Sequence, residues 1–167
     1  MIFKFKKHDS DLYNKLLILS RNIFFYEKIK LADTFETRIY LMFVHFSIFF
    51  IVFKKKKLKF NQSAYDSLFN NIENNLRELG FGDISVNKKM KELNKIMYDI
   101  LLKIESKKSN DKKFKINEQL LQKYFNFSDK KNDYEKDLFY DYFVSFFNYC
   151  FAKTSNNMVE ESINFNF

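Results

Sequence analysis

Side chains that commonly carry catalysis or bind metals are scarce in this 167-residue chain, which has two histidines, His8 and His45, and one cysteine, Cys150. Zinc sites draw on Cys and His clusters, and calcium sites need acidic residues at fixed spacing, so the sequence predicts no metal site. It also contains no Gly-rich phosphate loop and no nucleophile elbow. We therefore expect a protein that is not an enzyme, needs no cofactor and takes no small-molecule substrate.

Arginine is rare in this chain, with three residues against 26 lysines. Only arginine presents a planar fork to a carboxylate, so we expect the arginines to pair with acidic side chains. The residues concerned are Arg21, Arg38 and Arg77, with Asp33, Glu78 or Asp83 as acidic partners. Two interpretations stay open: a structural polar network that holds helices together, or a polar surface that recognises another protein.

His45 lies in an aromatic stretch between Phe43 and Phe46, where a lone histidine is more often a hydrogen-bonded core residue than a ligand. It is nevertheless retained as a candidate for contact with a partner. The complete set of candidate client-binding or partner-binding residues is Arg21, Arg38, His45, Arg77, Glu78 and Asp83.

Both glycines of the chain, Gly80 and Gly82, fall in one short stretch, and the chain has no proline. Glycine just after an apolar helical run commonly closes the helix in a left-handed conformation, which predicts Gly80 as that closing residue. Gly82 then permits a tight bend, and Asp83 and Ser85 are placed to bond free amides of the next helix. The stretch predicts a helix, a rigid corner and a second helix.

The corner carries a family resemblance. Its sequence, Leu-Arg-Glu-Leu-Gly-Phe-Gly-Asp-Ile-Ser-Val over residues 76–86, resembles the central signature of the ubiquinol-cytochrome c chaperone family. The resemblance covers roughly residues 12–105, and no counterpart is evident after it. Further matching positions are Tyr13, Arg21, Phe25-Tyr26, Asp33-Thr34, Arg38, His45, Lys89-Met90 and Tyr98. The chain departs from the family pattern at Thr37 and Asp99, where glycine is usual.

The resemblance implies an all-helical assembly chaperone. Such a protein binds newly made cytochrome b and holds it for haem acquisition and for assembly into the cytochrome bc1 complex. It works by binding rather than catalysis, and in mitochondria it acts with a small partner protein near the ribosomal tunnel exit. The implied partners are therefore unassembled cytochrome b, and also a ribosome or a small partner protein.

Apolar residues recur at helical spacing through nearly the whole chain, which predicts an all-α, single-domain bundle of about five to six helices, mostly antiparallel neighbours. Asp9 or Ser10 is expected to open the first helix, whose apolar face is Leu12, Leu16, Leu19, Ile23 and Tyr26.

The next three helices follow from capping signals. Asp33 with Glu36 predicts the start of a second helix that runs into the lysines at 54–57. Asn61 or Ser63 opens a third helix, which ends at Gly80. The fourth presents Val86, Met90, Leu93, Met97, Ile100 and Ile104, so that the core of the fold spans residues 9–105.

The C-terminal part is predicted to be organised differently. Residues of about 106–116 are charged and polar and are interpreted as a linker, followed by helices within 117–153. The last of these carries Tyr134, Phe139, Phe143 and Cys150, and Cys150 is expected in the core. The tail over 154–167 is expected to be loosely attached.

Residues 39–53 are the most apolar segment, and they lead directly into Lys54, Lys55, Lys56 and Lys57. A helix of 15 residues rises only about 22 Å, against roughly 30 Å of bilayer hydrocarbon, so a membrane span is disfavoured. A core helix that is apolar all round is preferred. A helix with one face open to a client or bilayer, its lysines meeting anionic lipid or ribosomal RNA, remains the third interpretation.

The net charge of +8 and pI near 9.3 partly reflect AT-rich coding, which favours Lys, Phe, Asn, Ile and Tyr together. Residues 1–9 lack the apolar region of a secretory signal, so we expect a cytoplasmic, bacterial chain, with peripheral attachment at the inner face of the cytoplasmic membrane as a second option. The alternative function is a basic helical RNA- or ribosome-binding module, using lysines at 54–59 and 107–115. An exposed groove of aromatic side chains would favour a client; a continuous lysine stripe over buried aromatics would favour RNA.

Overall fold

The computed structural model describes residues 7–104, 114–127, 133–154 and 156–167, with the backbone alone for residues 7–10. These residues form six helices of eight residues or more and three short ones, and they contain no strand, which confirms the predicted all-α bundle. The elements are α1 (Lys7–Ser20), α2 (Phe24–Glu27), α3 (Phe35–Lys55), α4 (Gln62–Glu78), α5 (Asp83–Ile104), α6 (Glu118–Phe125), α7 (Asp133–Ala152), α8 (Met158–Glu161) and the 3-10 turn η1 (Ser162–Asn164).

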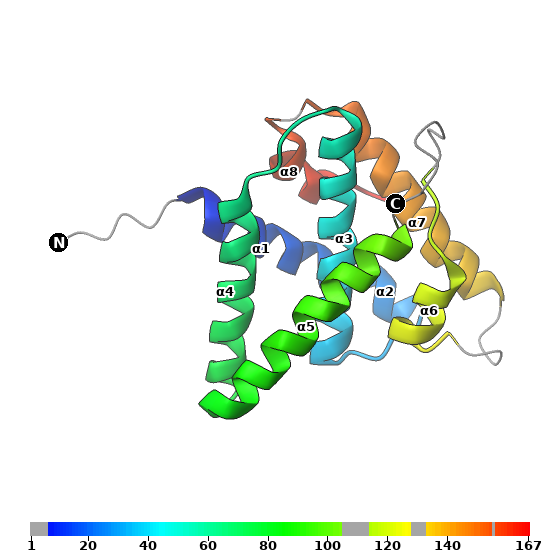
Figure 1. Cartoon of the computed structure of the whole chain (residues 1–167). Helices are drawn as coiled ribbons and strands as arrows, with labels where there is room; N and C mark the ends of the chain where they lie inside the picture. The colour runs from blue at the N-terminus through cyan, green and yellow to red at the C-terminus, as the bar shows by residue number, and fades with distance from the viewer. Residues whose placement is uncertain (1–6, 105–113, 128–132, 155) are drawn as a thin grey trace.

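Helix α3 stands at the centre and contacts α1, α5, α6 and α7, while α4 packs on α1 and α5 (Figure 1). In this view α3 rises, α4 descends and α5 rises again, so consecutive long helices are antiparallel. Within the described residues, α3 is the one helix long and apolar enough to cross a membrane, but 67% of its most apolar 18-residue window is buried inside the protein. It therefore serves as the core helix that the sequence favoured.

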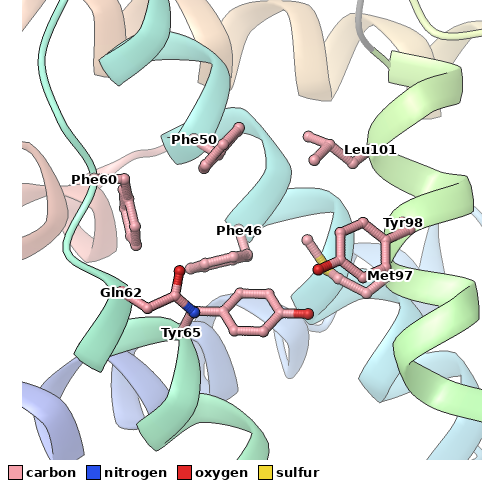
Figure 2. Close-up of a pocket in the computed structure, with 8 residues that line it drawn as sticks. All are labelled: Phe46, Phe50, Phe60, Gln62, Tyr65, Met97, Tyr98 and Leu101. Carbon is pink, nitrogen blue, oxygen red and sulfur yellow. The ribbon is translucent and has the colours of Figure 1, made fainter. Parts of the chain in front are cut away.

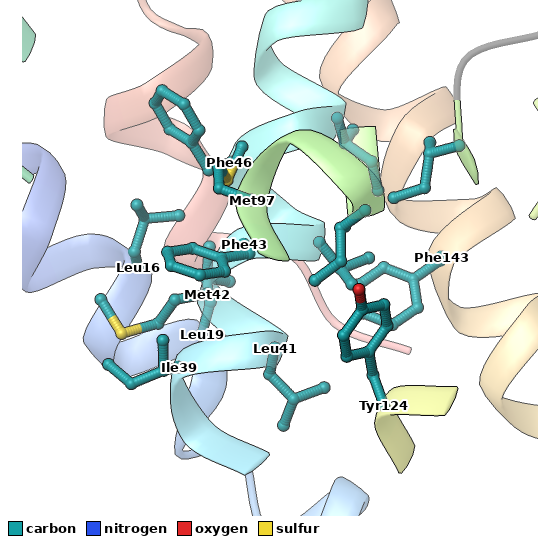
Figure 3. Packing of buried hydrophobic residues seen from close by; sticks show 14 of the residues in the cluster. Leu16, Leu19, Ile39, Leu41, Met42, Phe43, Phe46, Met97, Tyr124 and Phe143 are labelled. Carbon is teal, nitrogen blue, oxygen red and sulfur yellow. The ribbon is translucent and has the colours of Figure 1, made fainter. Parts of the chain in front are cut away.

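The core combines aliphatic and aromatic side chains, as the part drawn in Figure 3 shows. Burying one Phe side chain stabilises a fold by about 1.5–3 kcal/mol, so these rings contribute substantially beside the buried aliphatic residues. Fully buried rings come from α2, α3, α7 and the segment after α6: Phe25, Phe43, Phe46, Phe49, Phe127, Phe139, Tyr142, Phe143 and Phe146. Cys150 is also buried, as expected.

Side-chain hydrogen bonds define the starts of two helices, and the first of them confirms the predicted cap of α4. The Asn61 side chain accepts the Ser63 N–H at 3.0 Å and caps α4, and Asn117 accepts the Gln119 N–H at 2.9 Å to cap α6. The start of α3 differs by one residue, because Thr34 rather than Asp33 is the cap and accepts the N–H of Thr37 at 3.2 Å.

The first predicted helix is shorter than its apolar pattern indicated. α1 ends at Ser20, and Ile23, expected on its buried face, is 63% exposed. The side chain of Asn22 accepts the Phe24 N–H at 3.0 Å, which starts the separate helix α2. The Tyr26 hydroxyl then donates to the Ser20 carbonyl at 2.7 Å and holds the break closed. Local side-chain bonds of this kind compete with helix continuation.

The C-terminal tail is not loosely attached. Met158 and Ser162 are fully buried, and the Phe165 ring lies 5.3 Å from Phe146 and 5.4 Å from Tyr142. The tail is held because its apolar residues pack against aromatic side chains of α7. Most of the predicted linker, residues 106–113, lies outside the described residues, but Phe114 after it stacks on Phe147 at 5.0 Å and so belongs to the core.

Candidate functional site

The corner between α4 and α5 is closed by a pair of hydrogen bonds around Gly80. Its N–H donates to the Arg77 carbonyl at 3.0 Å, and the Phe81 N–H donates to the Leu76 carbonyl at 3.3 Å. Gly80 has a φ of +94°, which confirms it as the left-handed residue that ends α4. Gly82 needs no such conformation, and its carbonyl accepts the Val86 N–H at 2.9 Å to begin the α5 ladder.

Arg77 ties the two helices of the corner together. Its guanidinium donates to Glu73 at 3.0 Å, within α4, and to Asp83 at the start of α5. The hydrogen bond to Asp83, followed by that to Glu73, raises the pKa of Arg77. The predicted pairing with Asp83 is thus confirmed, whereas the predicted role of Asp83 as an amide cap is replaced by this ion pair.

The other two predicted arginines lie at the same end of the bundle. Arg38 contacts Asp33 through Nε at 2.7 Å and through an Nη at 2.6 Å. Burial raises the pKa of Tyr26, and this hydroxyl also feels the charges of Asp33, Arg38 and Arg21.

Tyr13 extends this link toward the corner. Burial raises the pKa of Tyr13; Arg21 opposes the shift and Glu78 adds to it. Three of the charged candidates, Arg21, Arg38 and Glu78, therefore act on one or both of these tyrosines, while Arg77 and Asp83 form the ion pair of the corner. We call this set the arginine end: Arg21, Arg38, Arg77, Glu78 and Asp83 with Tyr13 and Tyr26.

An apolar pocket opens between α3, α4 and α5 on the side away from the corner (Figure 2). Its volume is about 170 Å³. Burial raises the pKa of Tyr65, whose hydroxyl lies beside that of Tyr98 and donates to Asn94 at 3.2 Å, so one rim is polar. We call this pocket the α3–α5 groove, and its lining is Phe46, Phe50, Phe60, Gln62, Tyr65, Met97, Tyr98 and Leu101.

The model of the ubiquinol-cytochrome C chaperone family matches residues 27–136. The chain belongs to that family. No curated protein and no solved structure matches the chain. The family match includes the corner and all residues of the α3–α5 groove, and it continues through α6 into α7. The expectation that no counterpart exists after residue 105 was therefore wrong as far as residue 136, whereas Tyr13, Arg21 and Phe25 precede the match.

Asp99, where the resemblance led us to expect glycine, links α5 to α6. Asp99 on α5 accepts hydrogen bonds from Lys103, from the Tyr124 hydroxyl and from Lys123, the last at 2.9 Å. Burial acts to raise its pKa, but these donors outweigh burial and hold the pKa of the carboxyl well below its usual range. Asp99 thus provides an ionic link between α5 and α6.

His45 does not belong to a partner surface. It is fully buried among the rings of Phe25, Tyr142, Phe143 and Phe146. Its Nδ1–H donates to the Leu41 carbonyl at 2.7 Å, which leaves Nε2 to accept the Tyr142 hydroxyl at 3.1 Å. Burial lowers its pKa to about 4 despite the bond to Leu41, so the ring is neutral at pH 7. The inclusion of His45 as a client contact is corrected to a core role.

The lysines at the C-terminal end of α3 form a second turn of the same hydrogen-bond type as the corner. The Lys57 N–H donates to the Lys54 carbonyl at 3.0 Å, and the Leu58 N–H donates to the Phe53 carbonyl at 2.9 Å. Lys57 is left-handed with a φ of +56°, and Leu58 is 41% exposed. We call residues 54–59 the basic turn. Lys56 within it bonds the Lys153 carbonyl and lies 5.3 Å from the Phe151 ring centroid.

Sequence reasoning named the charged candidates but not the groove residues. It considered an exposed groove of aromatic side chains only in general terms, because the buried Phe46 and Met97 at the floor of the groove follow the spacing of ordinary core residues. Nothing in that spacing says that α4 and α5 diverge and leave Phe50 partly open. Over the described part of the chain, no three His, Cys, Asp or Glu side chains come together in a way that could hold a metal ion.

Proposed function

We propose that this chain is a non-enzymatic assembly chaperone that binds newly made cytochrome b and supports assembly of the cytochrome bc1 complex. Membership of the ubiquinol-cytochrome C chaperone family supports the assembly role. The observation that carries the choice of client site is the α3–α5 groove, an open apolar pocket within the matched region.

The groove has the chemistry of a site for one large apolar side chain. Cavities of roughly 150 Å³ lined by apolar groups take up a benzene ring, so about 170 Å³ suits a single aromatic or branched aliphatic side chain. Met97 at its floor is a flexible, polarisable contact that adapts to different occupants. The hydroxyls of Tyr65 and Tyr98 lie side by side at the rim, where Tyr65 donates to Asn94, so the edge of the pocket is polar while its floor is apolar.

The apolar surface continues from the groove along α5. Tyr98 is 59% exposed and Leu102 is 67% exposed, with Leu101 between them in the lining. Residues at i, i+3 and i+4 lie on one face of a helix, and an apolar client helix presents its own side chains at the same spacing. Transmembrane segments that await their partners expose such apolar helices, and cytochrome b is a client of that chemistry.

The groove also discriminates against the alternative of a basic RNA-binding module. That alternative required the aromatic residues to be covered and the lysines to carry the function. Phe50, Phe60, Tyr65 and Tyr98 instead remain open to solvent in part, in one continuous pocket. This arrangement favours an apolar client over a nucleic acid.

The arginine end supports a second contact of the same chaperone, with a partner protein. Beside Arg77 and Asp83, the corner exposes three apolar side chains: Leu79 at 57%, Phe81 at 38% and Ile84 at 88%. Apolar side chains surrounded by charges of both signs are the composition of a protein interface. We assign the expected small partner protein to this end and the client to the groove.

The test is purification of the tagged full-length chain from cells that make cytochrome b, with cytochrome b, ribosomes and RNA quantified in the eluate. We expect stoichiometric cytochrome b with the parent chain and its loss with Phe50→Ser or Leu101→Ser. Ile18→Ser is the matched control, because Ile18 is a 54% exposed apolar residue on α1 outside the groove. RNA or ribosomes in place of cytochrome b, released by moderate salt, would refute the proposal.

A further inference from the structure

The basic turn combines a single sign of charge with exposed apolar side chains. Five of its six residues are lysines, and Leu58 between them is 41% exposed. The Phe151 ring on the neighbouring end of α7 is 43% exposed and lies under the ammonium of Lys56. Lysines with apolar side chains projecting among them are the composition of segments that lie at the surface of an anionic bilayer.

The conformation of the basic turn holds its lysines and Leu58 on the surface of the bundle. Left-handed Lys57 reverses the chain, and the Leu58 N–H closes the turn on the Phe53 carbonyl. Leu58 is thereby held on the outside, while Phe53 behind it packs on the Phe60 ring at 5.2 Å. The basic turn is therefore a fixed projection of the fold.

The turn lies beside the α3–α5 groove. Phe60, one residue after the turn, lines the groove and contacts Phe46 at 5.3 Å and Phe50 at 5.9 Å between ring centroids. A surface that received the basic turn would thus have the groove at its edge.

Two described acidic side chains, Asp11 and Glu160, lie near Lys59 of the turn. They line the pocket on the far side of Phe60 together with Lys59. Both carboxylates are also within reach of Lys15, which lies 2.8 Å from Asp11 and 3.9 Å from Glu160. The corner at the other end of the bundle is different, because Arg77 there alternates with Glu73, Glu78 and Asp83.

We propose that the basic turn docks the protein on an anionic lipid bilayer, with Lys54, Lys55, Lys57 and Lys59 at the headgroups and Leu58 and Phe151 in the interfacial layer. A polyanionic RNA would use the lysines and could stack a base on Phe151, but it gives no reason for the aliphatic Leu58 to be exposed among them. Docking of this kind deepens the proposed function, since it places the groove at the bilayer surface where a membrane-inserted client is found. It does not depend on which client the groove binds.

The experiment is co-sedimentation of the full-length chain with vesicles of phosphatidylcholine containing phosphatidylglycerol and with vesicles of phosphatidylcholine alone. We expect binding to the anionic vesicles at least tenfold stronger, since each lysine near an anionic surface contributes about a factor of five. Replacement of Lys54, Lys55, Lys57 and Lys59 by Gln should weaken that binding by more than about tenfold. Leu58→Ser in the parent chain should also weaken binding to anionic vesicles, but it should not change the salt dependence of that binding.

The matched control replaces four exposed lysines elsewhere, Lys88, Lys91, Lys95 and Lys115, by Gln, so that both variants lose the same charge. Equal losses in the two variants would overturn the proposal, because binding would then follow net charge alone. Binding to a uridine oligonucleotide without binding to anionic vesicles would overturn it in favour of RNA. Phe50→Ser should lose cytochrome b yet keep vesicle binding, which separates failure of this proposal from failure of the client site. Circular dichroism melts check that each variant is folded.

Discussion

The two ends of the bundle use the same turn for different purposes. At the corner and at the basic turn, a left-handed residue ends a helix with the same pair of backbone hydrogen bonds. Gly80 occupies this position at the corner, whereas Lys57 occupies it in the basic turn. The corner is cross-linked by Arg77 to two carboxylates, while the basic turn carries charge of one sign. The same backbone conformation therefore forms a cross-linked connection between two helices at the corner and an exposed, positively charged turn at the end of α3.

The largest expected effect breaks the backbone of the corner. Gly80→Val places a β-branched side chain at a φ of +94°, and we expect the free energy of unfolding to fall by about 2 kcal/mol, within the usual range for such strain. Gly82→Ala is the matched control, because Gly82 lacks a positive φ and an added Cβ meets no atom within 4 Å. Urea denaturation of both variants measures the difference. If both variants lost the same free energy of unfolding, the loss would come from any added side chain at the corner and not from the left-handed conformation of Gly80.

A second prediction concerns the core, where His45 should make the free energy of unfolding depend on pH. The pKa of His45 is about 4 in the folded chain and 6.5 when exposed, so the unfolded chain binds more protons between these values. Stability should therefore fall as the pH decreases, by about 2 kcal/mol between pH 7 and pH 5. In His45→Gln, which keeps a hydrogen-bond donor near Leu41, this part of the pH dependence should disappear. A pH dependence that survives the substitution would assign it to other groups.

The left-handed position of the basic turn should respond with the opposite sign to that of the corner. Lys57→Gly removes the crowding of a Cβ in a left-handed residue but adds backbone freedom to the unfolded chain. We expect a net stabilisation of roughly 0.5–1 kcal/mol, together with weaker binding to anionic vesicles. Lys55→Gly, within the last turn of α3, is the control and should destabilise. A loss of stability in Lys57→Gly would show that the lysine side chain itself holds the turn.

The comparison also shows what the sequence could predict and what it could not. Gly80 was predictable because a glycine after an apolar helical run has one common structural use. Lys57 was not, since a lysine carries no signal for a left-handed conformation and the run of four lysines was interpreted as the end of a helix. Local hydrogen bonds determine the geometry of both turns. Only at the corner does the residue type, glycine, indicate the left-handed conformation in the sequence.

Long-range packing marks the limit of the sequence in the same way. Apolar spacing correctly placed α4, α5 and α7, because burial of one helical face needs no knowledge of the partner. It extended the first helix past Ser20, because the bond from Asn22 to Phe24 that starts α2 is invisible to periodicity. It also predicted a loosely attached tail, although Phe165 packs on Tyr142 and Phe146 of α7. The open groove depends on how α4 and α5 diverge, which spacing does not encode.

The smallest expected effect tests the cross-link that distinguishes the corner from the basic turn. Arg77→Lys keeps the positive charge but removes the planar fork that contacts Glu73 and Asp83 at once. Because Arg77 is exposed, the loss of stability should be small and should vanish in high salt, where exposed ion pairs are screened. Lys57→Arg at the other turn should leave stability unchanged, since no bidentate pair is required there. If Arg77→Lys instead leaves stability intact at low salt but abolishes binding of the partner protein, the fork serves recognition at the surface and the corner is held by Gly80 and its backbone bonds alone.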